Sequence, residues 1–304
     1  MSQIDAVRLN FSPESLIALN FVLAFVLFGV ALDLRLEDFR RLASAPKAAI
    51  IGVAAQFVLL PAAAYALGVL LRPAPSIALG MILVASCPGG NISNFLANHA
   101  RGNTALSVTV TACSTLGALV MTPFNTAFWG GLNPATRLLL QDFTIDPLEV
   151  LGSIAVLLLI PAALGIAVAW RWPAFAARAR RPFRIVSMLV FAIFALGALA
   201  ANWDFFLQHV HRVVLVVALL NGSGLALGYW AARAARLPEA DRRAIAIEVG
   251  IQNSGLGLVL VFNFFAGLGG MAVTVAWWGI WHIGSGLALA AHWRRRPPAQ
   301  VPAS

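Results

Sequence analysis

The chain has 304 residues, and only 11% of them are charged, whereas a soluble domain averages about 25%. Its residues are 60% hydrophobic, and apolar runs of about 20 residues, each long enough to cross a bilayer, recur along the whole length. This excludes a soluble globular protein. The net charge of +9 does not indicate nucleic acid, because the basic residues flank the apolar runs. We therefore expect an all-α polytopic membrane protein with a lipid bilayer, and no nucleic acid, as its partner.

Nine transmembrane helices are expected, separated by breaks that contain proline or clustered glycine. The expected ranges are 14–32, 46–71, 75–99, 104–128, 146–170, 184–202, 212–236, 240–265 and 271–293. The seventh range carries a Gly-x-x-x-Gly pattern at Gly224 and Gly228, which is typical of closely packed membrane helices.

The basic residues predict the orientation of these helices in the membrane. Loops between successive spans lie alternately on the two sides of the membrane. Seventeen of the 21 Lys and Arg fall in the loops and chain end of one side, which is the side of the C-terminus. The other four are Arg8, Arg72, Arg137 and Arg212. Because basic loops stay in the cytoplasm, the C-terminus is expected to be cytoplasmic and, with an odd number of spans, the N-terminus external. The expected location is the cell (inner) membrane.

Isolated polar side chains mark the second and fourth ranges. Gln56 is a lone amide between apolar residues, and such an amide alone is typical of helix–helix contacts. The fourth range carries hydroxyl side chains at helical spacing. Thr111 follows Ser107 by four residues, and either Ser114 or Thr115 follows at seven or eight, so these hydroxyls share one face of the helix. Bonding of these hydroxyls to their own helix backbone is the alternative interpretation.

The third range is interrupted by the stretch CPGGNIS. Pro88 lacks a backbone donor, and Gly89 and Gly90 support a helix poorly. Backbone groups freed within hydrocarbon cost several kcal/mol each unless protein or a polar cavity satisfies them. A simple kink, repaired by its own side chains, is the alternative to a binding site. The polar side chains of this break are Asn91, Ser93 and Asn94.

The eighth range carries a matching interruption, in AIAIEVGIQNSGLGLVLVF. Glu248 lies within it, followed by Gln252 and Asn253. A carboxylate inside a membrane span is expensive and indicates a functional site by default. The alternative is that Glu248 reaches the cytoplasmic interface or pairs with an arginine such as Arg243.

The two interruptions fall in different halves of the chain, and the expected topology runs them in opposite directions. Interrupted helices at corresponding places of inverted repeats are the best sequence indication of a secondary transporter's binding site. The amides at half-helix N-termini suit an anion, while carbonyls, hydroxyls and a carboxylate suit a hard monovalent cation.

At these residues the chain resembles the bile acid:sodium symporter family, and in particular its bacterial members. The matching stretches are FGVALDLRLEDFRRL, the run from Pro46 to Pro61, CPGGNISN, ARGNTALSVTVTACSTLGALVMTP, EVGIQNSGL and WHIGSG. They span about residues 14–293. Only one span precedes the Gln56 helix, so the chain looks like the nine-helix form of the family.

The resemblance implies a single transporter unit, 1–304, in which a core domain moves against a panel domain. The core would comprise 46–128 and 212–293, and the panel 14–32 and 146–202. The two broken helices would cross within the core, between inverted repeats, with sodium behind the crossing and an organic anion on its exposed face.

The resemblance also implies two bound sodium ions, and all the side chains required for them are present. The first ion would take Ser93, Asn94, Ser107, Thr111 and Glu248. The second would take Gln56, Glu248 and Gln252, with the backbone oxygens of Val249 and Ile251. The substrate-binding candidates are Asn91, Asn253 and His282, although a structural role is an alternative for His282.

The sequence therefore predicts a sodium-coupled secondary symporter of a small organic anion, such as a bile acid-like molecule, a keto or hydroxy acid or a sulfonate. A proton-linked metalloid or anion permease of the same superfamily and a non-transporting membrane sensor are the alternatives. We expect no enzyme, because no nucleophile with a base and no metal constellation is evident. No catalytic residue, no metal other than sodium and no obligate protein partner is expected.

Overall fold

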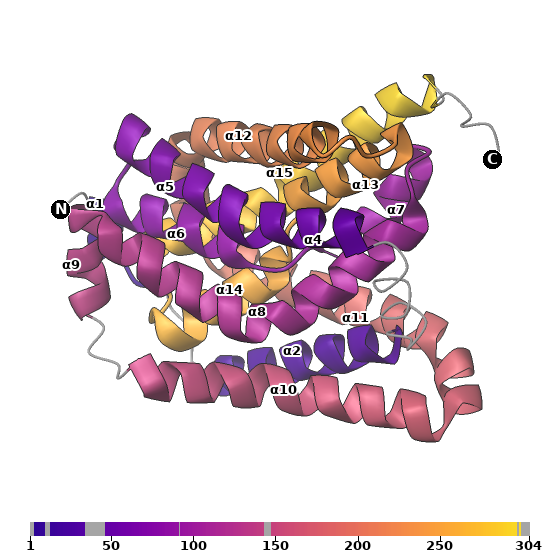
Figure 1. The fold of residues 1–304 in the computed structure, drawn as a ribbon. Coiled ribbons are helices and arrows are strands. Elements are labelled where there is room, and N and C mark those ends of the chain that lie inside the picture. Colours follow the sequence, from indigo (N-terminus) through magenta and orange to yellow (C-terminus); the bar gives the residue numbers. More distant parts are fainter. Residues whose placement is uncertain are drawn as a thin grey trace.

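The computed structural model describes residues 3–9, 13–33, 46–90, 92–142, 147–296 and 298, which are almost entirely helical (Figure 1). The helices are α1 (Gln3–Ala6), α2 (Pro13–Asp33), α4 (Pro46–Ala54), the π-helical turn η1 (Ala55–Leu59), α5 (Leu60–Leu71), α6 (Pro75–Ser86), α7 (Ile92–His99), α8 (Thr104–Leu132), α9 (Pro134–Asp142), α10 (Pro147–Arg171), α11 (Pro173–Ala201), α12 (Trp203–Ala234), α13 (Glu239–Gly250), α14 (Ser254–Phe264) and α15 (Gly269–Arg294). Within these residues, β-pairing is limited to two isolated antiparallel bridges.

Four helical stretches of the described chain are long and apolar enough to cross a membrane. They are Pro46–Leu71, α8, α12 and α15. A fifth span is possible if Leu159–Arg171 and Pro173–Arg180, which meet at 119°, are counted as one. The chain is thus a multi-pass membrane protein, and the count of nine spans stays a prediction. Helices α6 and α14 fall below the spanning length because each is one half of an interrupted segment.

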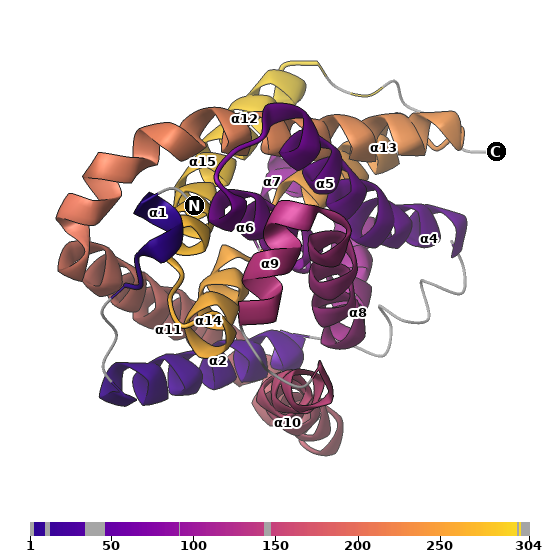
Figure 2. The same cartoon turned by 90° about the vertical axis from the view of Figure 1, so that its left-hand side faces the viewer.

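Helices α2, α10 and α11 pack together along one edge of the molecule, which is the lower edge in Figure 1. The ring of Phe183 in α11 stacks on Phe25 of α2 at 5.1 Å between centroids and lies 5.4 Å from Phe28. In the view of Figure 2, α2 and α10 again lie below the remaining helices. The interrupted helices α6–α7 and α13–α14 belong to the larger group above them.

The expected breaks in the third and eighth ranges are confirmed. Helix α6 ends at Ser86, before Pro88, and α7 begins at Ile92. Helix α13 ends at Gly250 and α14 begins at Ser254. Because each interrupted segment is divided into two half-helices, two new C-terminal ends and two new N-terminal ends are formed inside the helical body.

Close packing of the seventh range on its neighbour is also confirmed. A Cβ atom added at Gly228 in α12 would lie 2.7 Å from the carbonyl oxygen of Ile245 in α13, and one at Gly224 would lie 3.0 Å from that of Val249. The two glycines thus let the backbone of α12 approach that of α13 closely.

The structure contains two helices that the sequence analysis missed, the four-residue α1 and the longer α9. Helix α9 follows α8 directly, and Asn133 begins it by accepting a hydrogen bond from the backbone N–H of Ala135 at 3.0 Å. Pro134, at the first helical position, is preorganised for this conformation. A search for apolar runs of about 20 residues could not find α9, because it is short and mixes apolar with polar residues.

Two boundaries also differ from those expected. Helix α11 begins at Pro173 and not at 184, because the alanines and arginines of this stretch are strong helix formers even though they are too polar for a membrane span. Helix α12 begins at Trp203 and not at 212, so Arg212 lies within a helix and not in a loop. Its 32 residues extend over about 48 Å, more than the thickness of a hydrocarbon core.

Candidate functional site

The two helix breaks cross and pair with each other through their backbones. Gly89 and Gln252 form an isolated antiparallel bridge. The N–H of Gly90 donates to the carbonyl of Ile251 at 2.8 Å, and the N–H of Asn253 donates to the carbonyl of Pro88 at 2.9 Å. Backbone groups freed by one break are therefore satisfied by the other, which is the condition for unwound chain at membrane depth.

Glu248, near the end of α13, is wholly buried beside this crossing. One of its carboxylate oxygens, Oε2, accepts hydrogen bonds from Ser93 Oγ of α7 at 2.6 Å and from Ser107 Oγ of α8 at 3.1 Å. The other, Oε1, accepts from Thr111 Oγ1 of α8 at 2.7 Å. Thr111 Oγ1 also lies 3.3 Å from Asn94 Oδ1. Helices α7 and α8 thus provide neutral oxygen atoms around a carboxylate of α13.

No arginine of the described residues neutralises this carboxylate. The nearest basic residue along α13, Arg243, donates through Nε to Glu239 at 3.0 Å and through its terminal nitrogens to backbone carbonyls. Within the described part of the chain, Glu248 takes part in no salt bridge. The alternative that Glu248 pairs with an arginine or reaches the interface is therefore wrong, since its side chain is fully buried. A buried carboxylate that lacks a counter-charge is unstable unless a cation or a proton accompanies it.

The lack of a side chain at Gly89 leaves space for the carboxylate of Glu248. A Cβ atom at this position would overlap Oε1 of Glu248, so only glycine permits the observed approach. At Gly90, a Cβ would lie 3.1 Å from the carbonyl oxygen of Gln252. Gly89 is thus required for the close contact with Glu248, whereas a Cβ at Gly90 would be a tight contact that needs a small shift of the second break.

Gln56 and Gln252 form a second polar group on the crossing. Gln56 Nε2 donates to Gln252 Oε1 at 2.6 Å and to the carbonyl of Cys87 at 2.8 Å. Gln252 Nε2 lies 3.2 Å from Gln56 Oε1 and 2.6 Å from the carbonyl of Val249. Gln56 sits on the π-helical turn η1, a local widening that is frequent at functional sites. The second span is thus connected to both breaks.

The sodium-binding candidates therefore fall into two neighbouring groups. The first is Ser93, Asn94, Ser107, Thr111 and Glu248, and the second is Gln56, Val249 and Gln252. The two groups meet at α13, where Glu248 and Val249 are consecutive residues. The carbonyl of Ile251 lies at the crossing and accepts the N–H of Gly90.

Of the substrate-binding candidates, Asn253 lies on the second break and His282 lies on α15. Asn253 is half-buried and begins α14, since its Oδ1 accepts the N–H of Leu256 at 3.0 Å. His282 in α15 is buried, and its Nδ1 has no hydrogen-bond partner among the described residues. His282 lies one turn after Gly279, on the same face of α15. A Cβ atom added at Gly279 would lie 2.8 Å from Ser254 Oγ, so this face of α15 is directed at the second break. Asn91 lies outside the described residues.

Three further residues satisfy backbone groups near the breaks. Thr122 Oγ1 donates at 2.6 Å to the carbonyl of Ser86, the last residue of α6. Asn221 Nδ2 donates at 2.7 Å to the carbonyl of Gly250, the last residue of α13. The sequence analysis left open whether Ser114 or Thr115 continues the polar face of the fourth range. In the structure, Ser114 Oγ accepts a hydrogen bond from the backbone N–H of Gly89, with 3.4 Å between nitrogen and oxygen. Sequence analysis missed Thr122 and Asn221, and the only signal was a polar residue within an apolar run.

These features define a class of protein. A helical membrane protein in which two interrupted helices cross beside a buried carboxylate and a set of neutral oxygen ligands has the architecture of a secondary transporter.

Comparison with known proteins assigns the family. Residues 20–209 match the family model of the sodium bile acid symporter family. The chain is 35% identical over 278 residues to the "Uncharacterized sodium-dependent transporter YocS" of Bacillus subtilis, covering 91% of this chain and 83% of that protein. It is 35% identical over 282 residues to the "Probable sodium/metabolite cotransporter BASS1, chloroplastic" of Arabidopsis thaliana, covering 92% of this chain and 67% of the relative. The ileal sodium/bile acid cotransporter of Homo sapiens is 28% identical over 248 residues, covering 80% and 68% respectively.

The chain therefore belongs to the sodium bile acid symporter family. This is a family of membrane transporters, not of enzymes, and the names of the relatives support sodium as the co-transported ion.

Proposed function

We propose that this protein is a sodium-coupled symporter that carries a small organic anion across the cell (inner) membrane by alternating access. The observation that carries the proposal is Glu248, a wholly buried carboxylate with three hydroxyl partners and no salt bridge to another described residue. A bound cation would supply the missing counter-charge. Sodium is the cation that the relatives' names support.

Two sodium ions would bind behind the crossing, one at each of the two groups of oxygen atoms. Sodium is a hard cation and prefers oxygen ligands, as the hard divalent cations do. A hydroxyl group can rotate so that its lone pairs face an ion in place of its proton, so the groups that now donate to Glu248 can become ligands. The first set is Ser93, Asn94, Ser107, Thr111 and Glu248, and the second is Gln56, Glu248, Gln252 and the carbonyl oxygens of Val249 and Ile251.

The anionic substrate would bind on the opposite side of the crossing, at Asn91, Asn253 and His282. Two cations beside one carboxylate leave a net positive charge, and the N-terminal end of α14 adds a partial positive charge. Both favour an anion, and both link its affinity to sodium. A bile acid-like molecule, a keto or hydroxy acid and a sulfonate all have the required chemistry.

Movement would occur between two domains. The core domain would comprise 46–128 and 212–293, and the panel domain 14–32 and 146–202. The joint packing of α2, α10 and α11 along one edge supports this division. The distribution of basic residues would place the C-terminus in the cytoplasm, and nine spans would then place the N-terminus outside. A reporter that is active only in the cytoplasm should therefore give a signal when fused to Ser304. A silent but well-expressed fusion would contradict the orientation.

Glu248→Gln is the decisive experiment, because it keeps the shape of the side chain and removes the charge. Addition of sodium chloride, compared with potassium chloride, should raise the melting temperature of the purified wild-type protein. The variant should stay folded in the membrane but lose this stabilisation and all sodium-driven uptake. If Glu248→Gln retains the wild-type sodium response, the coupling site lies elsewhere.

The matched control is Glu239→Gln, which removes a carboxylate from the first turn of the same helix. Glu239 pairs with Arg242 and Arg243 and contacts none of the proposed ligands in the hydrogen bonds of the described residues. Its removal should leave the response to sodium unchanged, even if the variant is somewhat less stable overall.

A further inference from the structure

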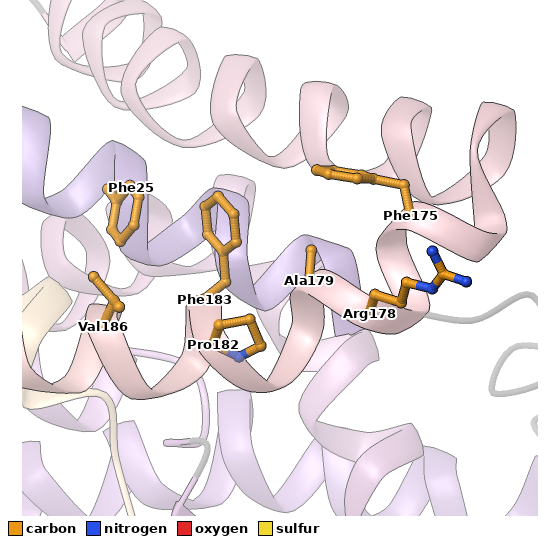
Figure 3. A pocket seen from close by; sticks show the side chains of 7 residues that line it. All are labelled: Phe25, Phe175, Arg178, Ala179, Pro182, Phe183 and Val186. Carbon is orange, nitrogen blue, oxygen red and sulfur yellow. The ribbon is translucent and has the colours of Figure 1, made fainter.

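An open pocket of about 380 Å³ lies away from the crossing, between α2 and α11 (Figure 3). Its lining is apolar except for a single arginine. The residues that line it are Phe25, Phe175, Arg178, Ala179, Pro182, Phe183 and Val186.

The pocket has one cationic end and one apolar end. Figure 3 shows Arg178 and Phe175 at one end of the row of side chains and Phe25 and Val186 at the other. The stacked rings of Phe25 and Phe183 form part of its wall. From residue 178 to residue 186, α11 rises about 12 Å, close to the roughly 15 Å of one hydrocarbon leaflet. The pocket thus has the length and polarity of a slot for a single-headed amphipathic chain.

The charge of this region is strongly one-sided. Five arginines fall between 171 and 184, whereas no Asp or Glu occurs between 150 and 203. Arg180 is engaged, because its Nε donates to the carbonyl of Leu32 at the end of α2 at 2.8 Å. Arg178 is exposed and has neither a salt bridge nor a hydrogen bond to another described residue. Its guanidinium is therefore available to an external anion.

The pocket opens at an apolar part of the molecular surface. Phe175 is 55% exposed and Val186 43%, on helices that belong to a membrane protein. Trp170 and Trp172, which are 82% and 57% exposed at the bend between α10 and α11, are typical of the membrane–water interface. We propose that this pocket is a binding site for an anionic membrane phospholipid, with an acyl chain along Phe25, Phe183 and Val186 and the headgroup phosphate on Arg178. A basic pocket between membrane helices suits such headgroups.

The test compares two lipids that differ only in charge. Purified protein is given equal amounts of phosphatidylglycerol and phosphatidylcholine with the same acyl chains, and retained lipid is measured by native mass spectrometry. Wild-type protein should retain phosphatidylglycerol preferentially. Arg178→Gln should lower this preference about fivefold, which corresponds to about 1 kcal/mol for one basic side chain near an anionic surface. Equal retention of both lipids would overturn the proposal.

Two further variants distinguish binding of the lipid in this pocket from general attraction of an anionic lipid by the net charge of the protein. Arg233→Gln removes another exposed arginine, which lies 5.0 Å over the ring of Trp230, and should leave the preference unchanged. An equal loss in both arginine variants would mean that net charge alone attracts the lipid. Val186→Trp fills the apolar end and should reduce retention of both lipids. If it retains both as the wild type does, no acyl chain occupies the pocket.

Discussion

The two helix breaks have the same backbone arrangement but opposite chemistry. Each donates one N–H and accepts one hydrogen bond across the crossing, through Gly90 and Pro88 on one side and Asn253 and Ile251 on the other. The first break contributes no charged side chain, and its glycines leave space. The second break follows Glu248, whose carboxylate fills the space beside Gly89, and carries Gln252, whose backbone carbonyl faces Gly90.

This difference shows that two crossing helix breaks need not share their functional groups equally. The backbone crossing can be symmetric because its hydrogen bonds depend only on main-chain geometry. The charge comes from the second break alone. The first break provides Gly89, which permits the close approach of the carboxylate, and a hydroxyl partner, as in the contact of Ser93 with Glu248.

The largest effect on the sodium response is expected when a side chain fills the space beside Gly89. In Gly89→Ala the added Cβ would overlap the carboxylate oxygen of Glu248, so the carboxylate must move or the crossing must open. We expect the stabilisation by sodium chloride over potassium chloride to be abolished in a thermal-shift measurement.

The control for this change is Gly222→Ala in α12, where an added Cβ meets nothing within 4 Å. Alanine is favoured over glycine in a helix by about 0.5–1 kcal/mol, so this variant should be no less stable and should respond fully to sodium. A normal sodium response in Gly89→Ala would mean that the carboxylate of the working protein does not occupy the space beside Gly89.

A smaller effect is expected from the loss of one hydroxyl partner. Thr111→Val removes the group that lies 2.7 Å from Glu248 Oε1 and keeps a similar shape. Hydrogen bonds to charged groups are worth about 1.5–3 kcal/mol, so we expect at least about tenfold weaker sodium binding. Titration of the melting temperature with sodium gives this affinity.

Thr115→Val is the matched control, because the Thr115 hydroxyl bonds at 2.7 Å to the carbonyl of Thr111 in its own helix. It should keep the wild-type affinity for sodium. Equal losses in the two variants would indicate a general effect on α8 and not a ligand at Thr111.

The smallest effect is expected on the exposed face of the crossing. Asn253→Ser replaces the amide but retains an oxygen that can cap α14, since serine is as good as asparagine at this position. Binding of the organic anion that best stabilises the wild-type protein in a panel of carboxylates and sulfonates should weaken about fivefold, roughly the net value of one hydrogen bond. The sodium response should be retained. If sodium binding weakens equally, Asn253 belongs to the ion site or to folding.

The sequence by itself determined the membrane class, the two interruptions and the unusual carboxylate. These depend on local properties: the length of apolar runs, the missing donor of Pro88 and the cost of placing Glu248 in hydrocarbon. The same local rules indicated close packing at Gly224 and Gly228, which the contacts with α13 confirm.

Only the tertiary structure decided which side chains meet. Gln56 and Gln252 are 196 residues apart, and no local pattern relates one to the other. The selection of Ser114 over Thr115 as the partner of the first break depends on how α8 is rotated, which neighbouring helices decide. The role of Gly89 likewise follows from the approach of α13. Helix α9 and the early start of α11 were hidden because mixed polar and apolar residues carry no signal of a membrane span, yet propensity and capping suffice to form a helix there.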